Sequence, residues 1–246
     1  MLSALKGGVS NHFGFLDTKI YEREPIMYVE IVSKCFDEIK QRKARLIYLL
    51  GKDDAGKTTL TRGVANKFIA DGERVAIIDA DIGQSSRLPL TISLLYGDKP
   101  FHSFSELILV EQEFIPSYDL VRYLERNTKT IARYAEKAKE GASYTFIDPT
   151  GFVENLGVMV KKKEIEAANP DLIIALERKS ELEPILKGLE YPLLKLPVLE
   201  EVKKRAETTR RKNRNERFKL YFRDSITQEV QAKAPSEWRN RVVALY

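Results

Sequence analysis

The most chemically informative stretch of the chain is a pattern of glycine, lysine and threonine that begins at Gly51. Residues 51–58 match the phosphate-binding pattern G-x-x-x-x-G-K-[ST], with an apolar run before it and a helical pattern after it. Glycine permits a tight turn in which backbone N–H groups point at phosphate oxygens. We expect Lys57 to reach the outer phosphates of a nucleotide and the Thr58 hydroxyl to hold Mg²⁺. The residues predicted to bind the nucleotide are Gly51, Asp54, Ala55, Gly56, Lys57, Thr58 and Thr59.

Two further candidates, Asp79 and Asp81, follow the apolar run 75–78. Carboxylates at the end of a buried strand beside a phosphate loop can hold Mg²⁺ or act as a general base. An aspartate in this position can instead cap the next element of structure. This second interpretation applies more strongly to Asp79 than to Asp81, so Asp81 is the predicted metal ligand and catalytic residue.

Strands and helices must position these groups, and the hydrophobic pattern predicts both. Strands are expected at residues 46–50, 75–78, 107–114, 142–147, 171–176 and 193–198. Helices are expected at residues 25–41, 58–70, 118–139, 157–168 and 180–188, and a loop at 88–91. Because strands alternate with helices, the predicted fold is α/β, a P-loop NTPase-type sheet, mainly parallel, with helices on both faces. Ligands of such folds bind at the carboxyl ends of the strands.

The composition excludes several classes of protein. The chain has 246 residues, 43% of them hydrophobic, which is enough for the core of one large domain. Cys35 is the only cysteine, so a disulfide framework is excluded and a reducing compartment is expected. No apolar run approaches the roughly 20 residues of a membrane span, and the N-terminus lacks a signal-peptide layout. We therefore expect a cytoplasmic protein without a membrane segment.

The net charge of +5 is concentrated near residues 203–223, where Lys and Arg far outnumber Glu. Clustered positive charge favours a polyanionic partner. The arginines of residues 201–222 are Arg205, Arg210, Arg211, Arg214 and Arg217. Helical spacing places Arg210, Arg214 and Arg217 on one face. A solvated basic face is the ordinary interpretation, but arginine also suits a phosphoryl group in transfer, so we interpret the segment as a lid over the site.

The predicted organisation has four parts. Residues 1–24 form a lead-in, 25–200 the P-loop core, 201–222 the Arg-rich lid, and 223–246 a short C-terminal extension.

Taken together, these blocks resemble the polynucleotide 5′-hydroxyl kinases, which include RNA kinases of tRNA splicing, pre-rRNA processing and mRNA 3′-end cleavage and archaeal relatives. The resemblance covers residues 25–222. Besides the phosphate loop and the lid, residues 81–84 are similar to the D-x-G-Q element of that family, and residues 150–153 to its T-x-G-W-V block. It implies ATP and Mg²⁺ as cofactors, and RNA or DNA with a 5′-hydroxyl end as the partner.

The resemblance also implies roles for individual residues. Lys57 would hold the β- and γ-phosphates, and Asp81 would activate the attacking hydroxyl or help position the metal. Arg205, Arg210 and Arg214 would belong to the lid, where at least one stabilises the transferred phosphoryl group. The residues implied to bind the terminal nucleotide are Gln84, Thr150, Gly151 and Phe152.

The chain departs from the family pattern on the substrate side. Phe152 replaces the usual tryptophan, and Pro149 stands where a threonine is expected. A phenylalanine still stacks on a base, but over a smaller area. Two alternatives therefore stay open: a non-catalytic ATP-binding scaffold of an RNA-processing complex, which would have protein partners, and a P-loop kinase acting on a small molecule. A GTPase is disfavoured because the chain has no N-K-x-D motif.

Overall fold

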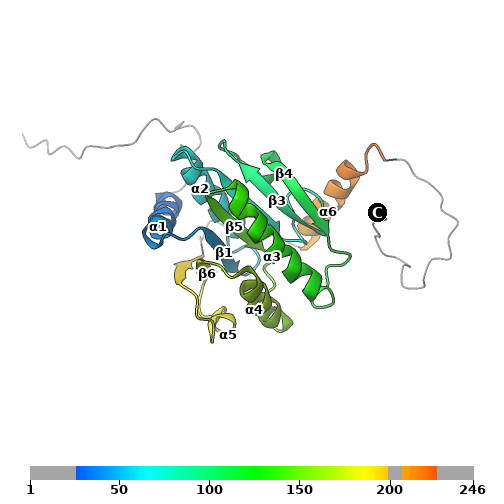
Figure 1. Cartoon of the computed structure of the whole chain (residues 1–246). Coiled ribbons are helices and arrows are strands. Elements are labelled where there is room, and N and C mark those ends of the chain that lie inside the picture. The colour runs from blue at the N-terminus through cyan, green and yellow to red at the C-terminus, as the bar shows by residue number, and fades with distance from the viewer. Residues whose placement is uncertain (1–25, 199–206, 226–246) are drawn as a thin grey trace, which may run out of the picture.

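The computed structural model describes residues 26–198 and 207–225 and contains a seven-stranded sheet of order β4-β3-β2-β5-β1-β6-β7 (Figure 1). The strands are β1 Leu46–Gly51, β2 Val75–Ala80, β3 Thr91–Gly97, β4 Ile108–Phe114, β5 Tyr144–Pro149, β6 Leu172–Glu177 and β7 Leu193–Pro197. Strands β2, β5, β1, β6 and β7 pair in parallel, whereas β3 runs antiparallel to both β2 and β4. The predicted α/β fold with a mainly parallel sheet is confirmed.

Helices cover both faces of the sheet. They are α1 Ile26–Arg42, α2 Lys57–Ala70, α3 Leu124–Gly141, α4 Leu156–Ala168, α5 Glu183–Leu186 and α6 Glu207–Tyr221, with a short 3-10 helix, η2 Phe104–Glu106. Side chains alternate along β1, so that Ile47 and Leu49 pack with α1 and α2, whereas Tyr48 packs with α3 and α4. Figure 1 shows α3 and α4 in front of the sheet. Strands β1 and β2 are buried along their whole length, and apart from Asp79 near the end of β2 their side chains are apolar, because both faces of the sheet are covered.

One strand was not predicted. Residues 91–97 form β3, which is buried along its whole length, and they follow β2 without an intervening helix. The expectation that strands and helices alternate throughout is therefore wrong between β2 and β4. An antiparallel neighbour needs no crossover helix, so a compact loop over residues 81–90 is sufficient to reverse the chain. The backbone N–H of Leu90 donates to the carbonyl of Ile82 at 2.9 Å within this reversal.

Two other expectations change at their boundaries. Helix α3 begins at Leu124 rather than at residue 118, because the Asp119 carboxylate accepts the backbone N–H groups of Val121 and Arg122 in a turn. Helix α5 is one turn long instead of spanning residues 180–188. Residues 201–206 of the predicted lid, including Arg205, lie outside the described residues, and the rest of that segment is helical as far as Tyr221. The four-part organisation of the chain stays a prediction.

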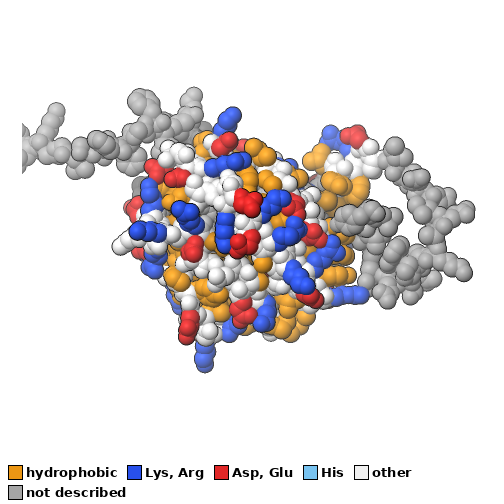
Figure 2. Space-filling model, in the orientation of Figure 1, with side chains coloured by type: hydrophobic (Ala, Val, Ile, Leu, Met, Phe, Trp, Pro, Cys, Tyr) orange, Lys and Arg blue, Asp and Glu red, His pale blue; other side chains and the backbone are white. Residues whose placement is uncertain are grey.

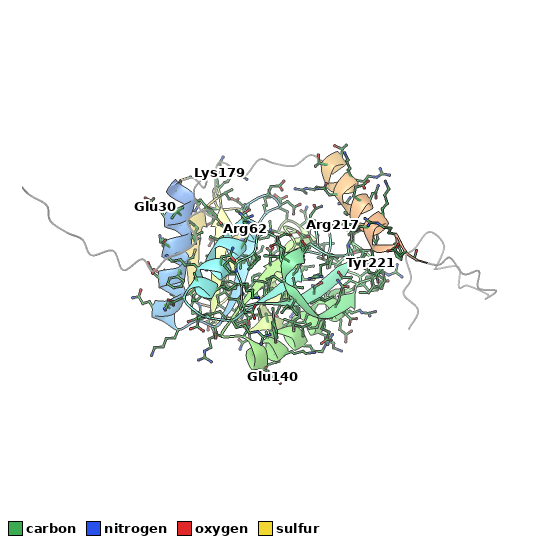
Figure 3. The ribbon with its side chains drawn as sticks, turned by 90° about the horizontal axis from the view of Figure 1, so that it is seen from above. Glu30, Arg62, Glu140, Lys179, Arg217 and Tyr221 are labelled. Atoms are coloured by element: carbon green, nitrogen blue, oxygen red, sulfur yellow. The ribbon has the colours of Figure 1, made fainter. Side chains whose placement is uncertain are left out.

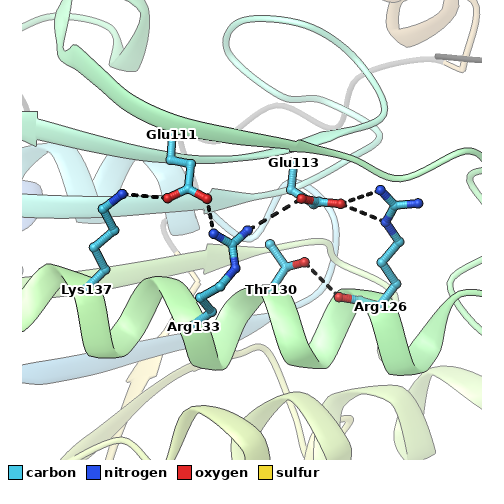
Figure 4. Close-up of polar contacts among 6 residues, drawn as sticks. All are labelled: Glu111, Glu113, Arg126, Thr130, Arg133 and Lys137. Atoms are coloured by element: carbon cyan, nitrogen blue, oxygen red, sulfur yellow. Dashed lines mark hydrogen bonds and ion pairs between the residues drawn. The ribbon is translucent and has the colours of Figure 1, made fainter. Parts of the chain in front are cut away.

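On the face of the molecule that includes α3, basic and acidic side chains are intermixed (Figure 2). A chain of ion pairs joins the edge strand β4 to α3, with Glu113 between Arg126 and Arg133, and Glu111 between Arg133 and Lys137 (Figure 4). These contacts help hold the antiparallel edge of the sheet against the helix. Among the described helices, none is long and apolar enough to cross a bilayer.

Candidate active site

The phosphate loop connects β1 to α2, as the glycine spacing predicted. Gly56 precedes the helix with a φ of 92°, a conformation that side chains with a Cβ rarely adopt. Lys57 is the first residue of α2, and its ammonium donates to the carbonyl of Gly51 at 2.9 Å and to that of Lys52 at 3.1 Å. Lys57 is buried, and burial lowers its pKa, while the nearby Asp148 opposes that shift. The two carbonyl contacts thus fix the position of the Lys57 side chain at the base of the loop.

Asp148 is a candidate site residue that the sequence analysis did not assign. It lies near the end of β5, which separates β1 from β2, and its Oδ2 accepts the Thr58 hydroxyl at 2.6 Å. Its Oδ1 is buried without a hydrogen-bond partner among the described residues. Burial raises the pKa of Asp148 to about 7, opposed by Lys57. The sequence shows a polar residue at a strand end, but not that this strand is the neighbour of β1.

The two aspartates after β2 have different surroundings. Asp79 is buried, and its Oδ2 accepts the hydroxyls of Ser85 and Ser86 and the backbone N–H of Ser86. The interpretation of Asp79 as a capping residue is therefore supported. Asp81 accepts the backbone N–H groups of Gly83 and Gln84 through Oδ1, at 3.1 and 3.0 Å. Burial raises the pKa of Asp81 to about 6, with Lys57 opposing the shift.

The loop after β5 is packed directly against the phosphate loop. A Cβ atom on Gly151 would lie 2.1 Å from the backbone nitrogen of Asp53, so only glycine permits this approach. Lys52 and Glu154 form an ion pair at 2.5 Å between the same two loops. Gly151 therefore sets how closely the predicted substrate loop approaches the nucleotide loop.

The arginines of α6 that were predicted to share a face all contact the site. Arg210 pairs with Asp53 at 2.7 Å and with Asp54 at 2.6 Å. Arg217 donates to the backbone carbonyls of Gln84 and Ser85. The guanidinium carbon of Arg214 lies 5.4 Å from the ring centroid of Tyr118. Figure 3 shows Arg217 on the side of α6 toward the body of the protein and Tyr221 near the end of the helix.

A hollow of about 950 Å³ lies between α6, the loop after β2 and the loop after β5. The predicted site residues that line it are Asp54, Asp81, Gln84, Thr150, Gly151, Phe152, Arg210 and Arg214. A second hollow along the phosphate loop is lined by Asp54, Ala55, Gly56, Lys57, Thr58, Thr59, Asp81, Gln84 and Arg210. Asp81 and Arg210 belong to both linings. The remaining predicted nucleotide-binding residue, Gly51, is the last residue of β1.

The residues of the phosphate loop and of the neighbouring strand end suit a nucleoside triphosphate with Mg²⁺. The loop offers backbone N–H groups and a helix start, both of which favour phosphate. Beside them, the Thr58 hydroxyl and the unpartnered Oδ1 of Asp148 supply oxygen ligands. Within residues 26–198 and 207–225, no group of three or more His, Cys, Asp or Glu side chains is arranged to hold a metal ion. Mg²⁺ typically binds through one or two protein oxygens, water and substrate phosphates, so the oxygens of Thr58 and Asp148 would be sufficient protein ligands.

Comparisons with known proteins bear on this arrangement. The sequence model of the family described as mRNA cleavage and polyadenylation factor CLP1 P-loop matches residues 51–224. A protein named polyribonucleotide 5′-hydroxyl-kinase from Pyrococcus horikoshii is 40% identical over 185 residues, which are 75% of this chain and 51% of that protein. A protein of the same name from Methanocaldococcus jannaschii is 36% identical over 190 residues, 75% of this chain and 52% of the other. This chain therefore spans about half the length of these curated relatives.

A solved structure supports the fold independently. The structure of Clp1p in complex with residues 454–563 of Pcf11p superposes with a TM-score of 0.58 at 15% identity, covering 81% of this chain and 54% of the other. The family match extends from the phosphate loop through α6 and so includes all three loops of the site. The resemblance indicated by the four sequence blocks is confirmed, and the chain belongs to the Clp1 P-loop family.

Proposed function

We propose that this chain carries the catalytic part of an ATP-dependent polynucleotide 5′-hydroxyl kinase, which transfers the γ-phosphate of ATP to the 5′-hydroxyl of RNA or DNA. The observation that supports this most directly is that Asp81 and Arg210 line both the phosphate-loop hollow and the larger one beside it. A base and a cation at that junction are what phosphoryl transfer between two bound molecules requires. The relatives named polyribonucleotide 5′-hydroxyl-kinase support the same reaction.

On the nucleotide side, the residues have to hold the triphosphate and balance its charge. Lys57 would exchange its contacts with the Gly51 and Lys52 carbonyls for the β- and γ-phosphates. Thr58 and Asp148 would hold Mg²⁺, which would neutralise phosphate charge. Arg210 and Arg214 would reach the transferred group from α6, and an arginine in such a position can contribute ~10³–10⁵ in rate.

On the acceptor side, Asp81 would take the proton of the attacking hydroxyl. Its pKa of about 6 leaves it ionised at neutral pH while keeping it a better base than an exposed aspartate. Phe152 is 40% exposed and Tyr118 is 46% exposed, and both line the larger hollow. Exposed aromatic rings of this kind stack on nucleotide bases. We assign the terminal nucleotide to this hollow, with Gln84, Thr150 and Gly151 beside it.

We expect the reaction to take place in the cytoplasm.

A phosphate-transfer assay tests the proposal. The purified chain is incubated with γ-labelled ATP, Mg²⁺ and a short 5′-hydroxyl oligonucleotide, with RNA and DNA in separate reactions. We expect label on the 5′ end, absent with Lys57→Ala, in which the cation of the loop is removed. If ATP binds but no label is transferred, the kinase is rejected for this chain in favour of a nucleotide-binding scaffold. If label reaches only a nucleoside or another small molecule, the substrate assignment is wrong.

A further inference from the structure

A buried charge network lies directly behind the predicted substrate loop. Lys161 on α4 is fully buried, and its ammonium lies 2.6 Å from Glu164 and 3.0 Å from the Thr150 hydroxyl oxygen. The other contacts of the Glu164 carboxylate are the Tyr48 hydroxyl at 2.6 Å and the Asn127 amide at 2.7 Å. Burial of an ion pair is costly unless its geometry and hydrogen bonds are good, so a lysine here calls for an explanation. Nothing in the reaction outlined above uses it.

The polarity of the Lys161 contact determines what Thr150 can bind. A lysine ammonium is a donor only, so it occupies a lone pair of the Thr150 oxygen and the hydroxyl hydrogen must point elsewhere. Thr150 itself lines the large hollow. Lys161 therefore leaves the hydroxyl hydrogen of Thr150 available for donation into the hollow, where a hydrogen-bond acceptor can receive it.

The hollow is lined by charges of both signs, with Arg178 among its cations. Lys52 pairs with Glu154, and Arg210 pairs with both Asp53 and Asp54, whereas Arg178 has no ion pair among the described residues. Arg178 lines the hollow together with Thr150, so it is the cation that an anionic acceptor bound there can pair with. A polynucleotide that enters with its 5′ end toward Asp81 carries its first anionic oxygens on the phosphate that joins the first two nucleotides.

We propose that Lys161 is a positioning residue that orients the Thr150 hydroxyl as a donor to the first internucleotide phosphate of the substrate strand. This inference rests on the proposed function, and it adds a specificity element to the same site. Lys161 acts only through Thr150, and it makes recognition depend on a substrate that has a phosphate 3′ to the reacting nucleotide.

The test compares two 5′-hydroxyl dinucleotides that differ at one linkage, either a phosphodiester or an uncharged methylphosphonate. We expect the wild-type chain to prefer the phosphodiester about tenfold or more in kcat/KM, the range of a hydrogen bond to a charged acceptor. Thr150→Val, which removes the hydroxyl but keeps the shape, should abolish most of this preference. Its KM for ATP should stay within about threefold of the wild-type value, because the nucleotide loop is unchanged.

Lys161 is tested with both charges removed, since a lone buried Glu164 would damage the fold. We expect Lys161→Met with Glu164→Gln to lose the linkage preference as Thr150→Val does, and the combination of all three changes to lose no more. Tyr48→Phe is the matched control: it removes a contact to the same Glu164 without touching Thr150, so stability should fall while the preference stays. The inference is overturned if the wild-type chain shows no linkage preference, or if the Lys161 variant keeps it. A wild-type chain that phosphorylates neither dinucleotide nor any oligonucleotide would overturn the proposed function instead.

Discussion

Helix α4 carries two Lys–Glu pairs with the same spacing and opposite surroundings. Lys161 and Glu164 lie 2.6 Å apart with side chains 0% and 2% exposed, whereas Lys163 and Glu166 lie 2.8 Å apart with side chains 58% and 48% exposed. The inner pair meets Tyr48, Asn127 and Thr150, as described above, whereas the outer pair is surrounded by water. Contact distance alone therefore says little about what an ion pair contributes.

The same contrast extends to the rest of the molecule. The inner charges are Lys57, Asp81, Asp148, Lys161 and Glu164, which lie under or beside the loops of the site. The outer charges are the Lys163–Glu166 pair and the chain of ion pairs between β4 and α3, in which Arg133 has a side chain 47% exposed. Low-dielectric surroundings strengthen the inner interactions and also raise the cost of breaking them. The inner charges should therefore determine activity, pH response and stability, and the outer charges should contribute little to any of them.

The largest difference between the two groups is expected in the rate of transfer. Asp81→Asn removes the proposed base while keeping its size, and we expect the rate to fall by about 10²–10⁴-fold with an unchanged circular dichroism spectrum. Glu166→Gln is the matched control, because it makes the same chemical change on the outer surface, and it should leave the rate unchanged. The readout is label transfer to a 5′-hydroxyl oligonucleotide. Full activity in Asp81→Asn would remove this residue from the base role.

The next difference concerns stability. Glu164→Ala leaves the Lys161 cation buried without its counter-ion, and we expect the free energy of unfolding to fall by about 3–5 kcal/mol. Glu166→Ala, on the same helix and with the same i,i+3 spacing, should cost less than about 0.5 kcal/mol. Urea denaturation of both variants measures the two losses in the free energy of unfolding. Equal losses in the two variants would show that burial is not the deciding factor.

A smaller effect is expected from pH. Asp148 has a folded-state pKa of about 7 and Asp81 one of about 6, both above the value of about 3.9 for an unfolded aspartate. The folded state therefore binds more protons between these values, and the free energy of unfolding should decrease as pH rises from about 4 to about 7. We expect a loss on the order of 1–3 kcal/mol between pH 5 and pH 8 in the nucleotide-free protein.

Asp148→Asn should reduce this decline, because one of the carboxyl groups with a raised pKa no longer titrates. Urea denaturation at each pH without nucleotide or Mg²⁺ gives the slope. A stability that increases across this window would contradict the assignment of Asp148 and Asp81 as carboxyl groups with raised pKa values.

The smallest effect is expected on the outer surface. A double-mutant cycle on Glu111 and Arg133 should give a coupling of about 0.2–1 kcal/mol, because both side chains are hydrated. The coupling should decline further in 1 M salt, because the Debye length falls to about 3 Å and salt screens the two exposed charges from each other. A coupling of several kcal/mol that persists in high salt would place this network with the inner charges.

The fold was predictable to a large extent because the buried parallel strands are continuous apolar runs and the helices have a regular apolar face. Strand β3 was missed although it is buried along its whole length. Its direction depends on how the loop after Asp81 folds back, and apolar periodicity carries no information on direction. The start of α3 was misplaced because two contacts of the Asp119 carboxylate with backbone N–H groups hold a turn there, so that the helix begins only at Leu124.

What the sequence determined by itself is the chemistry encoded in short spacings. The phosphate loop is encoded in eight consecutive residues. The turn in which Asp81 accepts the backbone N–H groups of Gly83 and Gln84 is encoded in four. The face shared by Arg210, Arg214 and Arg217 is encoded in two helical turns. Tertiary structure alone decided which of these local units meet. Asp148 reaches Thr58 across 90 positions, and Tyr48 reaches Glu164 across 116, because β5 lies beside β1 and α4 packs on that face. Local backbone geometry follows from neighbouring residues, whereas strand order and burial depend on how the whole chain packs.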